Sequence, residues 1–285
     1  MSPTEFSQWL SDPNRTALVM GVLNVTPDSF SDGGRFATVD AAVAQAEAMA
    51  AAGADMIDVG GESTRPGSLP VAPEEQVARV VPVIRRIANL PVTISIDTTR
   101  AAVADAALDA GAAVVNDISG GRDDAALLPL VARRGVSVIL MHMQGTPLTM
   151  QDAPVYSDVV AETIAFLRER VAAAQAAGVE LTKILLDPGI GFGKTQAHNL
   201  ELLRRQREFL ALGRPVVIGT SRKGFIGRIT GEAEPARRLF GTAASVALAV
   251  ANGAAIVRVH DVGPMVQVVR MTRAIVDQTP AETPR

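Results

Sequence analysis

The sequence predicts an α/β protein built as a single (β/α)8 TIM barrel. Short runs of β-branched residues alternate with longer alanine-rich stretches along the chain. Each short run is almost continuously apolar, which is typical of strands buried on both faces. Eight such pairs occur, and this number and spacing favour a closed parallel barrel over an open doubly wound sheet. A length of 285 residues suits one barrel domain.

The expected elements follow one another in strand and helix pairs, and several helices stop at a glycine, as a left-handed cap requires. These glycines are Gly53, Gly111, Gly135, Gly178 and Gly253. The expected strands are Ala17–Asn24, Met56–Val59, Val92–Ile96, Ala113–Asn116, Val136–Met141, Ile184–Leu186, Pro215–Ile218 and Ala255–Val259. The expected helices are Val39–Ala52, Pro73–Ala88, Ala101–Ala110, Asp124–Arg134, Asp158–Ala177, Ala197–Leu212, Pro235–Asn252 and Gly263–Val276.

One domain is expected, with a short segment at each end. Residues 1–16 precede the first strand and are predicted to close the bottom of the barrel. Residues 17–277 are predicted to form the barrel, and the Pro-rich residues 278–285 a disordered tail. No linker, composition shift or internal repeat beyond the β/α alternation divides the chain.

Composition excludes several classes of function. A net charge of -3 gives no reason to expect a nucleic-acid partner, so local positive groups must hold any anionic substrate. The chain has no cysteine, which rules out disulfides, thiolate metal sites and cysteine nucleophiles. The three histidines His142, His198 and His260 are dispersed, which argues against a histidine-based hydrolytic metal centre. No signal peptide or membrane span is expected, and a cytoplasmic location is predicted.

Polar side chains follow every expected strand, at the end of a barrel where active sites lie. Buried acids and bases are costly unless they are paired or used. The alternative is that they cap helices and form salt bridges around the rim. We assign Asp58 and Asp117 to that structural role and leave Glu62 open. The polar residues at these ends are Asn24, Asp58, Glu62, Thr64, Arg65, Asp97, Asn116, Asp117, His142, Asp187, Ser221, Arg222, Lys223, Arg258 and His260.

Two nucleotide-binding motifs fail on inspection. Gly193, Lys194 and Thr195 look like the end of a P-loop, but the position five residues before Gly193 is Pro188. The same segment lacks the last glycine of the dinucleotide fingerprint, where Lys194 stands. Nucleotide binding through either motif is not expected.

The motifs at the strand ends resemble those of the dihydropteroate synthase family of pterin-binding barrels. Residues 21–34 and 58–67 look like the first two signatures of that family, which are highly specific. The remaining matches follow in the right order, from the first strand to the eighth. They are residues 95–98, 115–120, 140–145, 187–194, 221–227 and 258–261. One departure is Gly224, where family members often carry serine, threonine or a larger residue.

The resemblance implies condensation of 6-hydroxymethyl-7,8-dihydropterin pyrophosphate with 4-aminobenzoate, giving 7,8-dihydropteroate and pyrophosphate for folate biosynthesis. It places Asp97, Asn116 and Asp187 on the nitrogen-rich edge of the pterin, which suits carboxylates because they accept paired donors. Lys223 would donate to the pterin oxygen and ring nitrogen. The alternative for Asp97 is a structural salt bridge to Arg100.

The resemblance also implies a site for the pyrophosphate leaving group. Asn24 would ligate Mg²⁺ together with phosphate oxygens, which is reasonable because Mg²⁺ needs few protein ligands. Thr64, Arg65, Arg258 and His260 would bind the phosphates, and arginine suits phosphate geometry. No side-chain nucleophile is needed, so we expect a dissociative, SN1-like route that depends on leaving-group stabilisation and positioning.

For 4-aminobenzoate the resemblance points to Ser221, Phe192 and Pro66. Phe192 either packs on its own barrel or covers a flat ligand ring. Residues 26–36 and 64–70 are expected to act as lids that exclude water. A sulfonamide that mimics 4-aminobenzoate is expected to compete there.

Two other functions stay open. A methyltransferase that moves a methyl group from methyltetrahydrofolate to a corrinoid shares the barrel, but does not need the motifs at residues 24–34 and 221–223. A non-catalytic pterin-binding protein is the second. A homodimer is expected by resemblance, and the apolar segments Ala243–Val250 and Met265–Val276 are the interface candidates.

Overall fold

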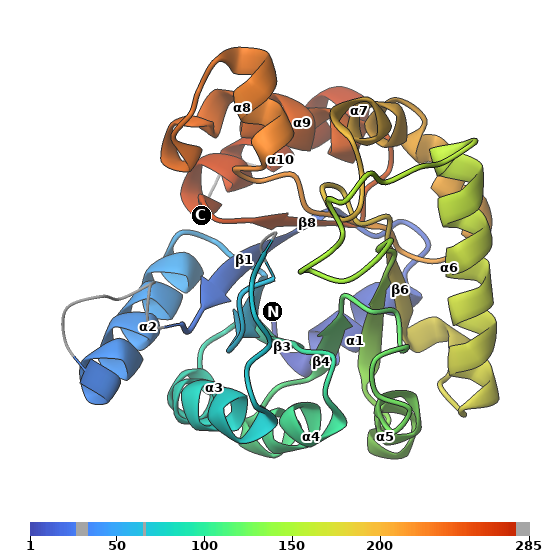
Figure 1. The fold of residues 1–285 in the computed structure, drawn as a ribbon. Helices are drawn as coiled ribbons and strands as arrows, with labels where there is room; N and C mark the ends of the chain where they lie inside the picture. Colours follow the sequence, from blue (N-terminus) through green and yellow to red (C-terminus); the bar gives the residue numbers. More distant parts are fainter. Residues whose placement is uncertain (27–33, 65–66, 278–285) are drawn as a thin grey trace.

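The fold is an eight-stranded parallel barrel surrounded by helices (Figure 1). We describe it from a computed structural model that defines residues 1–26, 34–64 and 67–277, the side chains of 34–38 excepted. Neighbouring strands pair in the order β6-β5-β4-β3-β2-β1-β8-β7, and a parallel bridge between Leu186 and Val216 joins β6 to β7. The ring is thereby closed, which confirms the predicted fold class.

Each strand lies close to its expected position. The strands are β1 (Leu18–Asn24), β2 (Met56–Gly60), β3 (Thr93–Asp97), β4 (Val114–Asp117), β5 (Ser137–Met141), β6 (Ile184–Asp187), β7 (Val217–Ile218) and β8 (Ile256–Val259). The α-helices are α1 (Pro3–Ser11), α2 (Gly34–Ala51), α3 (Pro73–Ile87), α4 (Ala101–Ala110), α5 (Leu127–Arg134), α6 (Val159–Ala176), α7 (Gln196–Arg204), α8 (Gly224–Thr230), α9 (Leu239–Ala251) and α10 (Val262–Val276). Three 3-10 helices, η2 (Leu181–Lys183), η3 (Gln206–Leu212) and η4 (Pro235–Arg237), complete the described elements.

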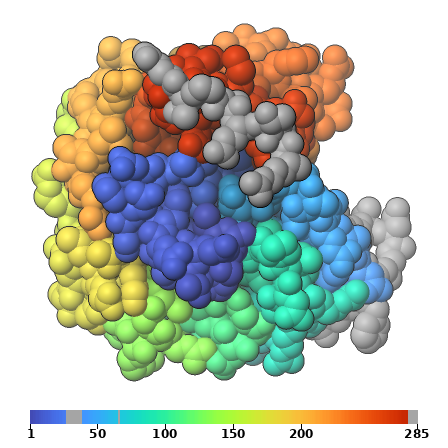
Figure 2. Space-filling model, turned by 180° about the vertical axis from the view of Figure 1, so that it is seen from behind, coloured from blue at the N-terminus to red at the C-terminus, as the bar shows by residue number. Residues whose placement is uncertain are grey.

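The amino ends of the strands are covered by the N-terminal helix. Ser2 and Glu5 form a capping box that starts α1, and Pro3 occupies its first turn. Phe6 and Trp9 then pack on inward-facing residues at the strand starts, Met20 and Met56 among them. Figure 2, seen from behind, shows this segment in blue across the middle of that face.

The helical layer differs from the prediction in two places. The helix expected at Ala197–Leu212 divides into α7 and η3, and the tighter turn directs Gln206 inward, where its Nε2 donates to Ala249 O at 2.9 Å. The helix expected at Pro235–Asn252 divides into η4 and α9, and it is preceded by an additional short helix, α8. Its two glycines hide it in the sequence, whereas buried Phe225 and Ile226 anchor it.

Several expectations fall outside the described residues. These are residues 27–33 of the first expected lid, Arg65 and Pro66 of the second, and the tail at 278–285. Within the part of the chain that is described, no helix is both long and apolar enough to cross a membrane.

Candidate active site

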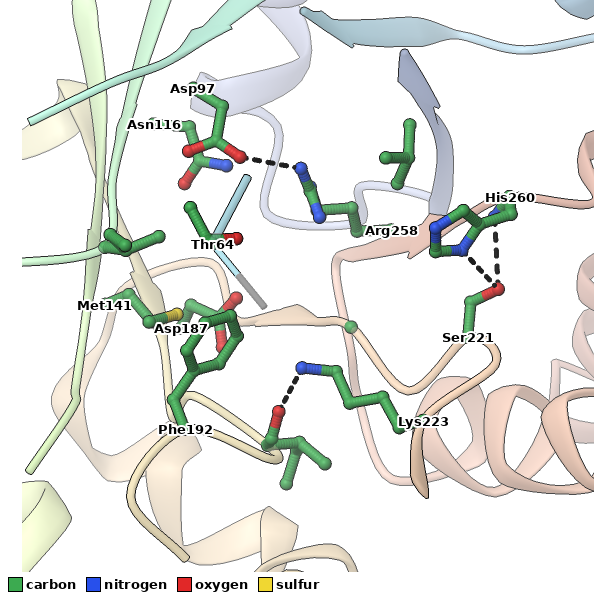
Figure 3. A pocket seen from close by; sticks show the side chains of 14 residues that line it. Thr64, Asp97, Asn116, Met141, Asp187, Phe192, Ser221, Lys223, Arg258 and His260 are labelled. Carbon is green, nitrogen blue, oxygen red and sulfur yellow. Dashed lines mark hydrogen bonds and ion pairs between the residues drawn. The ribbon is translucent and has the colours of Figure 1, made fainter. Parts of the chain in front are cut away.

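A polar pocket opens at the carboxyl ends of the strands (Figure 3). Strand register brings its residues to one level, since Asn24 pairs with Gly60, Gly60 with Asp97, and Asp97 with Asn116. The pocket is lined by Val22, Thr64, Asp97, Asn116, Ile118, Met141, Asp187, Ile190, Phe192, Gly219, Ser221, Lys223, Arg258 and His260. It therefore unites most of the predicted site residues from separate strand ends.

Three buried acceptor side chains form the floor of the pocket. Asp97, Asn116 and Asp187 stand on β3, β4 and β6, and each is less than 10% exposed. Each has one polar atom held by the protein: Asp97 Oδ2 by Arg258, Asn116 Nδ2 by Asp58, and Asp187 Oδ1 by the backbone of Gly189. Asp97 Oδ1, Asn116 Oδ1 and Asp187 Oδ2 accept no hydrogen bond from another described residue. The floor thus offers three acceptors to a ligand with several donors.

Arg258 crosses the barrel and joins two carboxylates. Its Nε donates to Asp58 Oδ2 at 2.7 Å and its Nη2 to Asp97 Oδ2 at 2.9 Å. Asp97 therefore pairs with Arg258 and not with Arg100, the alternative partner considered from the sequence. Asp58 forms a structural salt bridge, as assigned from the sequence, but it does not lie at the rim, because it is 0% exposed and lies inside the barrel. Asp117 does accept backbone N–H groups of its own turn, from Ser119 and Gly121.

Burial changes the acidity of the floor. It raises the pKa of Asp97 to about 7, and the charge of Asp58 adds to this effect while Arg258 opposes it. Burial also raises the pKa of Asp187, against the hydrogen bond from Gly189 and the charge of Lys223. Hydrogen bonds donated by a ligand favour the ionised form of these carboxyl groups.

Lys223 and Phe192 form one side of the pocket. Lys223 Nζ donates to the carbonyl oxygen of Ile190, the dashed line beside Lys223 in Figure 3. It also lies 4.1 Å from the centre of the Phe192 ring. Burial lowers the pKa of Lys223 to about 8, opposed by the charge of Asp187. Lys223 is also the residue that precedes α8, so the start of that helix determines its position.

The turn that carries Phe192 is held from below by a lysine that the sequence reasoning did not select. Lys194 is 2% exposed, and its Nζ lies 2.9 Å from His142 Nδ1 and 3.0 Å from the Phe192 carbonyl oxygen. Gly189 is required in this turn, because its φ is +70° and a Cβ would collide with the carbonyl oxygen of His142. A buried lysine is unusual and would have marked Lys194 as important, but its burial is known only once the fold is known.

The opposite side of the pocket is fixed by contacts between the loops after β7 and β8. Ser221 Oγ lies 3.1 Å from both the backbone nitrogen and Nδ1 of His260. Arg222 adopts a left-handed φ of 60° and binds both carboxylate oxygens of Asp261. A non-glycine residue in this conformation persists only where its surroundings hold it, and such residues cluster at functional sites.

A wider pocket continues from the first and is strongly cationic. Six lysine and arginine side chains line it, together with His260, and no carboxylate is among its described lining residues. The six are Lys194, Arg222, Lys223, Arg228, Arg238 and Arg258. Local positive charge therefore compensates for the net negative charge of the chain, as expected for a site that receives anions. Beside it, Glu62 accepts from Val71 N and Gln76 Nε2, a structural role within its loop.

Asn24, at the end of β1, lines the wider pocket. The space above Gly60 is bordered by two oxygens: a Cβ there would lie 3.6 Å from Asn24 Oδ1 and 3.8 Å from Asp97 Oδ2. Among the residues described, no group of three or more His, Asp or Glu side chains is arranged to hold a metal. A cation here would depend on Asn24, water and ligand oxygens, which suits Mg²⁺.

Fold and site together define a pterin-binding barrel enzyme. Residues 20–260 match the family described as pterin binding enzyme, and the chain belongs to that family. The dihydropteroate synthase of Synechocystis sp. is 46% identical, over 96% of this chain and 95% of its own length. That of Xanthomonas albilineans, solved with 4-aminobenzoic acid, is 46% identical with a TM-score of 0.87, covering 93% of this chain and 94% of that chain. The Xanthomonas albilineans enzyme in complex with 7,8-dihydropteroate is 43% identical, with a TM-score of 0.84 over 93% and 95% of the two chains.

Proposed function

We infer that this chain catalyses the dihydropteroate synthase reaction. It condenses 6-hydroxymethyl-7,8-dihydropterin pyrophosphate with 4-aminobenzoate to give 7,8-dihydropteroate and pyrophosphate. The observation that carries this conclusion is a floor of three acceptors beside the half-buried Lys223, which opens into a pocket lined by basic side chains. The first part suits a reduced pterin, and the second suits its pyrophosphate and the carboxylate of 4-aminobenzoate.

The pterin ring is proposed to lie on the floor. Its ring and exocyclic nitrogens carry several N–H donors along one edge, and the remaining oxygens of Asp97, Asn116 and Asp187 accept them. Lys223 would donate to the ring oxygen and nitrogen on the other side. Phe192, which already covers Lys223, would lie against the ring system.

The pyrophosphate is proposed to meet Arg258, His260, Thr64 and Arg65. Arg258 uses Nε and one Nη2 donor on Asp58 and Asp97, so its Nη1 group remains for phosphate oxygens. Asn24 would hold Mg²⁺ through Oδ1. The ion, when bound, neutralises part of the charge that develops on the leaving pyrophosphate.

The reaction is proposed to be dissociative. The bond between the exocyclic methylene carbon and the pyrophosphate oxygen breaks first, and its electron pair leaves with pyrophosphate. The electron-rich dihydropterin stabilises the positive charge left on the methylene. The arylamine nitrogen of 4-aminobenzoate then forms the new C–N bond and loses a proton. The protein contributes position and electrostatic stabilisation, and no side chain is needed as a nucleophile.

The second substrate is proposed to enter through the wider pocket, between Phe192 and Ser221, with Pro66 as a third contact. The Ser221 hydroxyl is hydrogen-bonded to His260, which is proposed to bind the pyrophosphate. Ser221 would therefore link the site of the leaving group to the site of the incoming amine. The cationic lining favours the 4-aminobenzoate carboxylate.

Product analysis separates this function from a corrinoid methyltransferase. The protein is incubated with the dihydropterin pyrophosphate, 4-aminobenzoate and Mg²⁺, and in parallel with methyltetrahydrofolate and a reduced cobalamin. Dihydropteroate in the first reaction and no methylcobalamin in the second support the synthase. The reverse result would assign the barrel to methyl transfer, and binding without either product to a non-catalytic protein.

We propose that Mg²⁺ supports activity and that the protein acts as a homodimer in the cytoplasm. A dimer is supported by apolar side chains on α9 and α10 that are largely exposed in the single chain: Phe240 at 85%, Met271 at 63% and Ile275 at 65%. Light scattering tests the dimer, and a mass of one chain at micromolar concentration would contradict it. The lack of cysteine agrees with a reducing compartment.

A further inference from the structure

Asp58 lies beneath the pocket and contacts two of the residues that form it. It follows Met56 by two positions on β2, so both side chains point into the barrel. Its Oδ2 accepts hydrogen bonds from Asn116 Nδ2 at 2.9 Å and from Arg258 Nε at 2.7 Å. Asp58 is fully buried and does not line the pocket, so any effect on a ligand must pass through these two neighbours.

The contact with Asp58 decides which atom Asn116 presents to a ligand. An asparagine amide has an acceptor side and a donor side of similar size, and a turn of 180° exchanges them. An ionised carboxylate only accepts hydrogen bonds, so Asp58 requires Nδ2 on its own side. Oδ1 of Asn116 is therefore left for the pocket, beside the free oxygens of Asp97 and Asp187.

We propose that Asp58 is a positioning residue that sets the ring selectivity of the pocket by locking the Asn116 amide with its oxygen toward the ligand. With the amide locked, every uncommitted atom of the floor is an acceptor. A ring with an exocyclic amine on that edge is bound, and a ring with a carbonyl there meets oxygen against oxygen. This inference rests on the proposed function, because it takes the preferred ring to be a pterin.

The contrast between two rings measures this directly. Pterin carries an amino group at position 2, and lumazine carries a carbonyl in its place. A site that is built around a hydrogen bond discriminates strongly against an analogue that cannot make it, because the unmatched polar groups stay buried. In the locked pocket lumazine is therefore rejected. Once the Asn116 amide is free to turn, its Nδ2 donates to the lumazine carbonyl, and the selectivity falls.

The experiment is isothermal titration of pterin and of lumazine into the wild type and three variants. Asp58→Leu, which removes the carboxylate at similar volume, is expected to reduce the ratio of the two affinities by about tenfold or more. Asp58→Asn retains an oxygen that is able to replace Oδ2, and is expected to keep the ratio within about threefold of wild type. Asp55→Leu is the matched control, since among the described residues Asp55 accepts a hydrogen bond only from Val19 N–H, at the far end of the barrel. It is expected to lower the melting temperature and leave the ratio unchanged.

The outcomes are separable. An unchanged ratio in Asp58→Leu overturns the proposal, as does an equal loss in Asp55→Leu, which would indicate general loosening. A wild type that binds neither ring contradicts the proposed function itself. If Asp58→Leu does not fold, hydrogen exchange of the Asn116 side-chain amide in the wild type tests the proposal. The NMR signal of this amide is assigned by its absence from the spectrum of Asn116→Asp. Exchange much slower than that of exposed amides supports the lock, and equally fast exchange overturns it.

Discussion

The ammonium group of Lys223 lies 4.1 Å from the centre of the Phe192 ring, and both residues line the polar pocket as well as the wider pocket. The two residues reach this point from different loops, after β7 and after β6. The ring face attracts the cation and shields it from water, which holds Lys223 in the lining of the pocket. Phe192 is therefore expected to position Lys223, in addition to its proposed contact with ligand rings.

Removal of the ring while an apolar side chain is kept tests this contact. A partly desolvated cation–π pair contributes about 1 kcal/mol, so Phe192→Leu is expected to lower kcat/KM for the dihydropterin pyrophosphate about fivefold. Lys223→Met removes charge-assisted hydrogen bonds and is expected to cost about 10- to 100-fold. Steady-state kinetics on both variants checks whether the loss in kcat/KM is smaller for Phe192→Leu than for Lys223→Met. Equal losses in the two variants would mean that the phenylalanine acts independently of the lysine.

Pterin affinity is expected to follow a bell-shaped dependence on pH. Protonated Asp97 no longer accepts two donors, so binding weakens as pH falls below its pKa of about 7. Lys223 loses its proton and its charge as pH rises above its pKa of about 8, so binding also weakens on the alkaline side. Dissociation constants should rise about tenfold between pH 7.5 and pH 6 on the acid side. Asp97→Asn should remove the pH dependence on the acid side only. An unchanged pH dependence there would mean that another group titrates.

Ser221→Ala is expected to separate phosphate binding from ring binding. The substitution removes both contacts that Ser221 Oγ makes with His260. At about 1 kcal/mol for each hydrogen bond, kcat/KM for the pyrophosphate substrate should fall roughly tenfold or more. Affinity for 6-hydroxymethylpterin, which has no pyrophosphate, should stay within about twofold of wild type. An equal loss for both ligands would contradict a role through His260.

Lys194→Met is expected to reduce both stability and pterin binding. The substitution leaves His142 Nδ1 and the Phe192 carbonyl oxygen without their donor in a buried position. This should lower the free energy of unfolding by about 2 kcal/mol, measured by urea denaturation. The released turn should also weaken the contact of Phe192 with Lys223. Lys183→Met, at a lysine that binds Glu180 and a backbone carbonyl on the surface, is the control, and a similar loss there would contradict the account.

Much of the site follows from the sequence because a parallel barrel collects all strand ends on one face. Asp97, Asn116, Asp187 and Lys223 were predicted as a group on this reasoning, and the structure brings them into one pocket. Their roles toward substrates stay predictions.

What the sequence could not predict depends on register and on which face of a strand is inward. Asp58 and Arg258 are separated by 200 positions, and their contact arises only when the barrel closes. The strand containing Asp58 is buried on both faces, so no alternation marks this residue as inward-facing. Lys194 belongs to the match at residues 187–194 and to the failed nucleotide motif, but the sequence assigns it no role, because its partner His142 comes from another strand end. The short helix α8 was missed since glycine has low helix propensity and burial stabilises it instead.

Pyrophosphate release tests the central claim most directly. It is measured with the dihydropterin pyrophosphate, with and without Mg²⁺ and 4-aminobenzoate, for the wild type and for Asn24→Ala, Lys223→Ala and the surface control Lys183→Ala. The account predicts that release by the wild type and the control requires both additions, and that Asn24→Ala and Lys223→Ala lose about 100-fold or more. Release that does not depend on 4-aminobenzoate, or full activity in both site variants, would contradict it.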